Sequence, residues 1–284
     1  MTLKLFAKPV ADQIQKDVQG RVSQFTRAHG RPPKLSVILV GSDSASRIYT
    51  QRKGELAQAL GMSHETLSFA SDVSPKTVRD CVLTLNDDPN IDGILIQRPL
   101  PKSFDENEVL FWIEPNKDVD AFHPLHAGRL FLGLPTFQPC TPAGIMELLK
   151  FYKIAPSGQV ACVIGRSSIV GKPMASLLLQ SDATVIHCHS KTPDLKDLTR
   201  QAGLLIVAAG KPNLIDDTHV QPGAVVIDVG IHRATDGRLI GDVDFGRVST
   251  VASAITPVPG GVGPMTLAIL MRNTIHAAEL REAL

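Results

Sequence analysis

The sequence lacks any long run of apolar residues. None of its apolar runs reaches the about 18 residues that a membrane-spanning helix needs. The segment 1–17, MTLKLFAKPVADQIQKD, contains no apolar stretch as long as the core of a signal peptide. We therefore expect no membrane association and a chain that stays in the cytoplasm.

An excess of charge of one sign is also missing. The 284 residues include 29 lysines and arginines against 28 aspartates and glutamates, a formal net charge of +1. Aromatic residues make up only 5% of the chain, so nucleic-acid bases would find few rings on which to stack. Both features argue against a broad nucleic-acid-binding face. A hydrophobic content of 43% is ordinary for an enzyme with a well-formed core.

Cysteine is scarce and follows no metal-binding spacing. The four cysteines are Cys81, Cys140, Cys162 and Cys188. They form no C-x-x-C motif and mostly sit inside apolar runs, so we expect buried thiols rather than disulfides or a structural zinc site. His187 and His189 alternate on one predicted strand, but no other ligands accompany them in the sequence. We therefore predict no metal.

Segments with helical and strand-like patterns alternate along the chain. The predicted helices span 7–29, 44–60, 75–85, 105–113, 142–152 and 264–280, and the predicted strands span 34–41, 66–69, 93–97, 160–165, 183–189, 204–210 and 224–230. Ser74-Pro75 and Thr141-Pro142 each supply an N-cap residue and a proline at N1. Gly30 and Gly61 are expected to end helices. Proline-rich loops surround the short helix at 105–113.

This alternation predicts the fold class. Strands joined by crossover helices of this length form right-handed βαβ units, which build a parallel sheet. We predict an α/β protein with two α/β lobes, the second a Rossmann-like parallel sheet, and a cleft between the lobes. The first lobe is expected to comprise 1–140, completed by the C-terminal helix at about 264–284. The second lobe is expected to comprise 141–263.

The stretch VACVIGRSSIVGKP, residues 160–173, has the pattern of a strand, turn and helix start that bind a dinucleotide. Gly165 permits the tight turn, and the helix N-terminus directs N–H groups at a phosphate. The G-x-G-x-x-G spacing is not kept, because Ser167 replaces the second glycine and the third comes one place late, at Gly171. Ser167 can bind an anion through its N–H and hydroxyl groups. A plain βα turn is the alternative interpretation.

The residues after the next predicted strand bear on the choice of cofactor. An NAD enzyme places an aspartate or glutamate there, about 20 residues after the glycine loop, on the ribose hydroxyls. Here the strand 183–189 is followed by Ser190 and Lys191. A carboxylate repels a 2′-phosphate, whereas hydroxyl and cationic donors bind one. Together with Arg166, these residues favour NADP.

Polar residues of the first lobe form several candidate motifs. Tyr49 and Lys53 stand four apart on one predicted helix face; a solvated lysine beside a half-buried tyrosine is the alternative. Short-chain dehydrogenases also have a Y-x-x-x-K pair, but their glycine loop precedes it. Gln97 ends a predicted strand, where ligands of open α/β sheets bind. Asp118 and Asp120 lie on a loop, where turn formation is the alternative to ligand binding.

The loop ITPVPGGVGPMT, residues 255–266, is rigid enough for a planar ligand to approach its backbone, although a structural role is the alternative. It follows the motifs Y-x-x-x-K, Q-x-P-L-P, K-D-V-D, P-C-T-P, G-R-S-x-x-V-G-x-P, C-H-S-x-T and G-D-V. In this order the motifs resemble the bifunctional methylenetetrahydrofolate dehydrogenase/methenyltetrahydrofolate cyclohydrolase family over nearly the whole chain. Arg98, Ala121 and His126 depart from the family pattern, at the expected rim of the pocket.

The resemblance implies a set of site residues and partners. Gly165, Arg166 and Ser167 would hold an NADP phosphate, Ser190 would lie near the 2′-phosphate, and the backbone of Ile231 would meet the nicotinamide. The implied substrate-binding residues are Tyr49, Lys53, Gln97, Asp120, Pro257 and Gly260. The implied assembly is a homodimer paired through the NADP domain.

The resemblance also implies a two-step reaction of one-carbon metabolism that serves purine biosynthesis. A hydride passes from 5,10-methylenetetrahydrofolate to NADP, and water then opens the methenyl ring to give 10-formyltetrahydrofolate. Lys53 would transfer protons, with Gln97 and Tyr49 positioning it, and Asp120 would accept hydrogen bonds from the pterin. A shikimate-type NADP dehydrogenase and a catalytically inactive binding homologue are the alternatives. The folate loop argues against the first, and the intact set of polar residues against the second.

Overall fold

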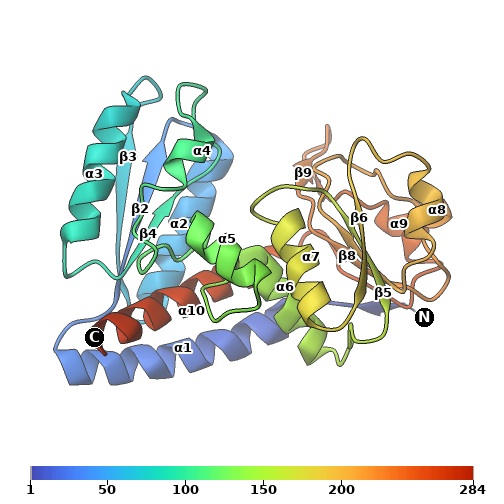
Figure 1. The fold of residues 1–284 in the computed structure, drawn as a ribbon, viewed down its shortest axis with the longest axis horizontal. Helices are drawn as coiled ribbons and strands as arrows, with labels where there is room; N and C mark the ends of the chain where they lie inside the picture. Colours follow the sequence, from blue (N-terminus) through green and yellow to red (C-terminus); the bar gives the residue numbers. More distant parts are fainter. Residues whose placement is uncertain (1, 284) are drawn as a thin grey trace. The chain divides into compact units, whose positions relative to one another are not determined.

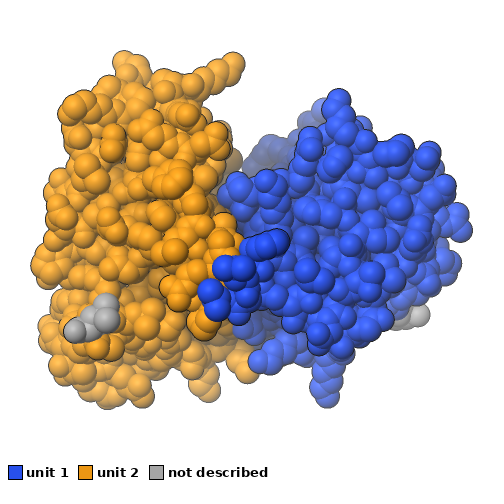
Figure 2. Space-filling view, viewed as in Figure 1, with its two compact units in different colours: residues 1–12, 130–134, 138–266 blue, residues 13–129, 135–137, 267–284 orange. Residues whose placement is uncertain are grey.

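The structure is a computed structural model that describes residues 2–283, which fall into two compact units (Figures 1 and 2). Unit 1 comprises 1–12, 130–134 and 138–266, and unit 2 comprises 13–129, 135–137 and 267–284. Helices α1 (Lys8–His29) and α10 (Gly263–Glu282) each begin in unit 1 and continue in unit 2. Within residues 2–283, no helix has the length and hydrophobicity needed to cross a membrane.

A three-stranded parallel sheet forms the centre of unit 2. The elements that follow α1 along the chain are β2 (Lys34–Val40), α2 (Ser44–Ala59), β3 (Ser63–Phe69), α3 (Pro75–Asp87), β4 (Gly93–Ile96), α4 (Glu106–Val109) and α5 (Pro124–Phe131). The strand order is β3-β2-β4, and Ile38 of β2 pairs with Ile96 of β4. The carboxyl ends of β2 and β4 therefore lie side by side.

Helices cover both faces of this sheet (Figure 1). Val78 and Val82 of α3 pack with Ile38 and Ile94, and all four side chains are fully buried. Helix α2 lies on the opposite face. Burying an aliphatic side chain of this size stabilises the fold by about 1.5–3 kcal/mol. Apolar residues on both faces of β2 explain why its sequence shows a continuous apolar run.

Unit 1 contains the second sheet. Its elements are β1 (Leu3–Lys4), α6 (Cys140–Phe151), β5 (Val160–Ile164), α7 (Gly171–Gln180), β6 (Thr184–Cys188), α8 (Leu195–Thr199), β7 (Leu204–Val207), the 3₁₀ turn η1 (Asp217–His219), β8 (Val225–Asp228), β9 (His232–Arg233), β10 (Leu239–Ile240), α9 (Phe245–Val248) and β11 (Ala254–Ile255). The six parallel strands have the order β1-β11-β8-β7-β5-β6, and β9 and β10 form a separate antiparallel pair.

The strand order of this sheet indicates where a ligand would bind. The chain passes from β5 outward to β6 and then returns to β7 on the other side of β5. In open α/β sheets, ligands bind beyond the carboxyl ends of the strands where the order reverses in this way. The predicted α/β class, with two α/β lobes and a Rossmann-like parallel sheet in the second, is confirmed.

The observed helix ends agree with the predicted ones at Gly30 and Ser74 in unit 2 but not at Thr141 in unit 1. Ser74 caps α3 by accepting a hydrogen bond from the backbone of Thr77 at 3.1 Å, and Gly30 adopts a positive φ of 69° after α1. The predicted N-cap at Thr141 is wrong, because α6 already begins at Cys140 and Pro139 holds the cap position. Instead, the Thr141 hydroxyl bonds the hydroxyl of Thr266 at 2.9 Å.

Other differences concern short elements. The helix predicted at 105–113 is limited to Glu106–Val109, and α5 lies in a region predicted to be loop. Strand β3 begins three residues earlier than predicted, at Ser63. Strands β1, β9, β10 and β11 were not predicted, since two residues cannot show an alternating pattern.

Candidate functional site

A cavity of about 440 Å³ lies at the carboxyl ends of β5, β6 and β7 in unit 1. Its lining residues are Ile164, Gly165, Arg166, Ser167, His189, Ser190, Thr192, Leu195, Ala208, Ala209, Lys211 and Leu214. Four residues predicted to bind the cofactor, Gly165, Arg166, Ser167 and Ser190, thus lie around one cavity. Ile231 is not among the lining residues; it precedes β9 and is 57% exposed.

The unusual glycine loop has a steric explanation. Gly165 has a φ of 119°, and a Cβ there would lie 2.0 Å from the carbonyl oxygen of Ala208. A Cβ on Gly171 would lie 1.9 Å from the carbonyl oxygen of Gly165. Gly171 therefore permits the close approach of helix to strand for which the usual motif uses a glycine one place earlier.

Ser167 has a local role at the start of α7. Its Oγ accepts hydrogen bonds from the backbone N–H groups of Val170 at 3.1 Å and Gly171 at 3.3 Å. A hydroxyl in this position satisfies N–H groups that have no partner within the helix. It also fixes the loop at the cavity wall.

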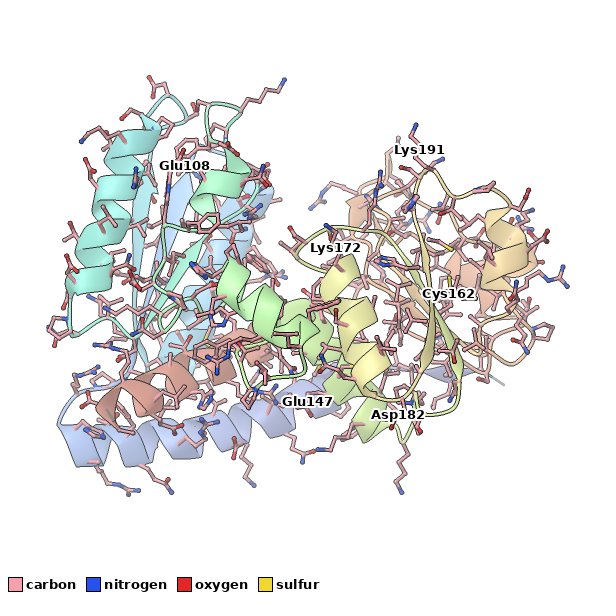
Figure 3. All side chains as sticks on the ribbon, in the orientation of Figure 1. Glu108, Glu147, Cys162, Lys172, Asp182 and Lys191 are labelled. Carbon is pink, nitrogen blue, oxygen red and sulfur yellow. The ribbon has the colours of Figure 1, made fainter. Side chains whose placement is uncertain are left out.

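The cavity has a positive electrostatic character. Among its lining residues in the described part of the chain, Arg166 and Lys211 are cationic and none is acidic. Lys172, at the start of α7, and Lys191, after β6, lie at the same end of unit 1 (Figure 3). Lys211 was not predicted as a site residue, although it directly follows the predicted strand 204–210, where ligands of such sheets bind.

The two alternating histidines bond backbone groups. Nε2 of His187 donates to the carbonyl oxygen of Gly165 at 2.7 Å, and Nδ1 of His189 accepts the N–H of Lys191 at 3.2 Å. Both contacts stabilise the loops around the cavity. Nearby, the buried thiols of Cys162 and Cys188 lie 3.8 Å apart, and burial raises the pKa of both. Cys140 is also buried, whereas Cys81 is only half-buried.

In unit 2, three of the predicted site residues lie together. Nζ of Lys53, on α2, donates to Oε1 of Gln97 at 2.8 Å, and it lies 5.1 Å from the ring centre of Tyr49. Lys53 is only 4% exposed. Gln97 directly follows β4, and its Nε2 donates to the carbonyl oxygen of Arg98 at 2.6 Å. Lysine is rarely buried unless it has hydrogen-bonding partners, so this arrangement points to a specific role.

Asp118 and Asp120 lie on a segment beside β4. Asp118 forms a parallel bridge with Ile94, which brings Asp120 toward the end of the strand. Both aspartates line a cavity of about 20 Å³, which suits a water molecule rather than a pterin ring. Asp118 accepts the backbone N–H of His123 at 2.6 Å. Burial nevertheless raises the pKa of the Asp118 carboxyl to about 7.

Lys117 anchors this segment. Its Nζ donates to the carbonyl oxygens of Leu85, Asn86 and Asp88 at 2.7–2.9 Å. These carbonyls belong to the last turn of α3 and the residue after it, where a helix has no internal donors left. Lys117 is therefore a structural residue of the K-D-V-D motif, and it holds the loop that carries Asp120.

The three departures from the family pattern have different environments. Arg98 pairs with Glu106 at 2.5 Å and lines the small cavity. Ala121 is buried, with a φ of 60° that costs a residue with a Cβ about 1–2 kcal/mol. The expectation that His126 lies at the pocket rim is wrong: the residue is 6% exposed, and its ring nitrogens bond Thr136 and Pro115.

Pro257 and Gly260 belong to unit 1, in the loop between β11 and α10. The carbonyl oxygen of Gly260 accepts the N–H of Ala7 at 2.9 Å, and Gly260 has a φ of 101°. A Cβ on the adjacent Gly261 would lie 2.6 Å from the carbonyl oxygen of Pro257. The loop is therefore tightly turned and attached to the segment before α1.

A Rossmann-like sheet with a glycine loop and an acid-free cavity is typical of a nicotinamide dinucleotide-dependent oxidoreductase. Comparison with known families gives two matches: the tetrahydrofolate dehydrogenase/cyclohydrolase catalytic domain over residues 5–120 and the NAD(P)-binding domain of the same family over residues 139–282. The chain belongs to the tetrahydrofolate dehydrogenase/cyclohydrolase family.

Individual relatives agree with this assignment. The chain is 50% identical over 275 residues to the bifunctional protein FolD of Ligilactobacillus salivarius. This match covers 97% of the present chain and 96% of the Ligilactobacillus protein. The solved structure of the bifunctional FolD enzyme of Campylobacter jejuni has a TM-score of 0.96 at 44% identity, covering 99% of this chain and 100% of that one. The Trypanosoma brucei enzyme, solved with NADP and an inhibitor, has a TM-score of 0.95 at 34% identity. The match covers 100% of this chain and 99% of the Trypanosoma chain.

These comparisons settle several predictions. The predicted family, the bifunctional dehydrogenase and cyclohydrolase, its tetrahydrofolate substrates and its nicotinamide dinucleotide cofactor are confirmed. The shikimate-type alternative is not supported, since the shikimate 5-dehydrogenase of Thermus thermophilus is only 14% identical, with a TM-score of 0.54. That similarity shows a related fold and no more.

Proposed function

We propose that this chain oxidises 5,10-methylenetetrahydrofolate with NADP and then hydrolyses the methenyl product to 10-formyltetrahydrofolate, with unit 2 holding the folate and unit 1 the cofactor. The lobes expected from the sequence, 1–140 with 264–284 for folate and 141–263 for NADP, stay a prediction. Their bounds differ from those of the units, because 1–12, 130–134, 138–140 and 264–266 fall in unit 1. The cleft expected between the lobes stays a prediction. The observation that carries the proposal is the hydrogen bond of 2.8 Å that the buried Lys53 donates to Gln97.

The unit 1 residues supply the cofactor chemistry by binding alone. When bound, NADP accepts the hydride. Arg166, Ser167 and the N-terminus of α7 bind its phosphates, and Ser190 with Lys211 binds the 2′-phosphate. Cationic and hydroxyl donors make charge-assisted hydrogen bonds to phosphate, and an acid-free cavity lets the 2′-phosphate enter without repulsion. The NADP complex of the Trypanosoma brucei relative supports this choice.

The unit 2 residues act on the folate. Lys53 transfers protons during hydrolysis of the methenyl ring, because it is the cationic side chain that the fold buries beside a polar partner at the end of β4. Gln97 and Tyr49 position it. Asp120 accepts hydrogen bonds from the amino and ring N–H groups of the pterin. Pro257 and Gly260, which belong to unit 1, contribute a rigid backbone surface for the planar part of the substrate.

Two further proposals concern assembly and location. The protein pairs as a homodimer through unit 1, as the family resemblance implies, and works in the cytoplasm on small folates without nucleic acid or membrane. Sedimentation of the purified protein tests the first statement, because a monomer at micromolar concentration would contradict it.

One assay tests the whole proposal. Purified protein is mixed with methylenetetrahydrofolate and either NADP or NAD, and the absorbances of methenyltetrahydrofolate and of the reduced cofactor are followed together. The expected result is reduced cofactor with NADP and only transient methenyl absorbance. Reduction without any hydrolysis of added methenyltetrahydrofolate would refute the second activity. Absence of reduction with both cofactors would favour an inactive binding homologue.

A further inference from the structure

Two buried aspartates of unit 1 have no place in the reaction described above. Asp228 ends β8 and is 3% exposed, and Asp242 follows β10 and is fully buried. A buried carboxylate is costly unless hydrogen bonds or charges compensate for the lost water. The contacts of each one therefore show what its burial achieves.

Asp242 connects two segments of the cofactor unit. Its Oδ2 accepts backbone N–H bonds from Ala209 at 2.7 Å and from Gly210 at 2.9 Å. Its Oδ1 receives the Nε2–H of His232 at 2.7 Å, since an ionised carboxylate only accepts. Ala209 lines the cofactor cavity, and His232 directly follows Ile231. One carboxylate thus fixes both the turn after β7 and the start of β9.

Asp228 in turn holds Asp242 in place. Its Oδ1 accepts the backbone N–H groups of Gly230 and Asp242, both at 2.9 Å, and its Oδ2 accepts that of Val243 at 3.0 Å. The two aspartates therefore form one hydrogen-bonded unit. Each carboxylate accepts three hydrogen bonds, as buried polar groups require. Burial and the neighbouring Asp242 nevertheless raise the pKa of the Asp228 carboxyl to about 6.

Two glycines provide the space for this arrangement. A Cβ on Gly241 would lie 1.8 Å from Oδ2 of Asp228, and a Cβ on Gly230 would lie 2.4 Å from Oδ1 of Asp242. Any side chain at either position would displace a carboxylate. This packing explains the G-D-V motif and the glycine at the end of AVVIDVG, neither of which the proposed reaction uses.

We propose that Asp242 is a positioning residue for the nicotinamide end of NADP: it fixes the backbone of Ile231, through His232, relative to the turn that lines the cofactor cavity. Asp242 acts through these groups and does not line the cavity itself. The inference rests on the proposed NADP function. Groups that orient reacting atoms must be held to fractions of an ångström, and buried supporting hydrogen bonds supply that precision.

The test uses the two activities of one enzyme. Asp242→Asn preserves the shape of the side chain but turns one acceptor into an N–H donor, which faces groups that themselves donate. The KM for NADP should rise about 10- to 100-fold, the usual effect of losing a hydrogen bond to a charged group. Hydrolysis of added methenyltetrahydrofolate, which consumes no NADP, should stay near the wild-type rate. A merely structural role would lower both activities together.

A matched control lies two residues away. Asp244 accepts the backbone N–H of Arg247 at 3.1 Å at the start of α9. Asp244→Asn therefore removes a partly exposed carboxylate of the same size from unit 1 and leaves the Asp242 contacts in place. This variant should keep the wild-type KM for NADP. Calorimetric titration of each variant with NADP, together with its melting temperature, separates weakened cofactor binding from unfolding.

A second variant serves if Asp242→Asn does not fold. His232→Phe keeps a ring but removes the N–H donor, and a rise of about 3- to 10-fold in the KM for NADP is expected from one neutral-donor hydrogen bond. An unchanged KM in either folded variant, or an equal loss of both activities, would overturn the proposal. A wild-type protein that reduces no NADP would instead refute the proposed function.

Discussion

Replacing Lys53 with methionine should slow hydrolysis of methenyltetrahydrofolate by about 10²- to 10⁴-fold, the usual contribution of general acid–base catalysis. The change removes the ammonium group, which donates to Gln97 at 2.8 Å, and retains an unbranched chain of similar length at a position that is 4% exposed. Hydride transfer needs alignment but no proton acceptor, so the dehydrogenase rate should fall less. Methenyltetrahydrofolate should then accumulate.

The cost in stability should be small enough for the variant to fold. Oε1 of the half-buried Gln97 loses a donor. An unsatisfied buried acceptor costs about 1–3 kcal/mol, which is an upper bound for a group that water can partly reach. Gln97 keeps its other hydrogen bond, from Nε2 to the carbonyl oxygen of Arg98. Thermal unfolding of the Lys53→Met variant measures this loss of stability independently of its activity.

The two half-reactions are assayed separately. Hydrolysis is followed by the loss of methenyl absorbance after adding methenyltetrahydrofolate, and oxidation by the absorbance of reduced NADP. Arg52→Met is the matched control, because it removes a cation from the same helix at an exposed position next to Lys53. Its two rates should remain near wild type. A folded Lys53→Met protein that hydrolyses methenyltetrahydrofolate at the wild-type rate would remove Lys53 from the mechanism.

Three further predictions test other parts of the site. Ser190→Asp should erase a preference for NADP over NAD of about 10- to 150-fold, because a carboxylate would repel the 2′-phosphate; equal kcat/KM for both cofactors in the wild type would contradict this. Asp120→Ala should lower both activities and weaken binding of a folate analogue in calorimetry about 10- to 150-fold, and loss of only one activity with normal binding would rule out its pterin role. Burial raises the pKa of Asp118 to about 7, so the folded state binds this proton more tightly than the unfolded chain, and the associated stability is lost as the pH rises from about 4 to 7. Relative to the wild type, the unfolding free energy of Asp118→Asn should therefore increase over that range in denaturant titrations; a constant difference would show that Asp118 does not titrate there.

The sequence predicted the structure best where a short local pattern determines the backbone conformation. The glycine loop, the helix ends at Gly30 and Ser74, and the long strands follow from backbone conformation and periodicity within a few residues. Tyr49 and Lys53 could be paired because α2 places residues four apart on one face. The position of Gln97 at a strand end indicated only that it could meet a ligand, and its grouping with Tyr49 and Lys53 was implied by the family resemblance.

Features that depend on distant partners could not be predicted in this way. His126 is buried because Thr136 and Pro115 satisfy its ring nitrogens, and no local pattern marks those partners. The pairing of β1 with β11 joins residues about 250 positions apart, each strand two residues long. Lys211 was missed for a different reason. The strand before it was predicted, but the lysine itself matched no known motif.

The discontinuity of both units has a consequence for how this chain is made and divided. Unit 1 takes its edge strand from Leu3–Lys4, and unit 2 takes α10, whose Asn273 donates to the carbonyl oxygen of Val119 at 2.9 Å. During synthesis, at about 5–20 residues per second, β1 must wait unpaired until β11 emerges, and the core of unit 2 is complete only with the last helix. Cutting the chain between the two family domains would take an edge strand from one and a packed helix from the other. The two catalytic steps are thus tied to a single polypeptide by its connectivity, and separating them would require rebuilding both units.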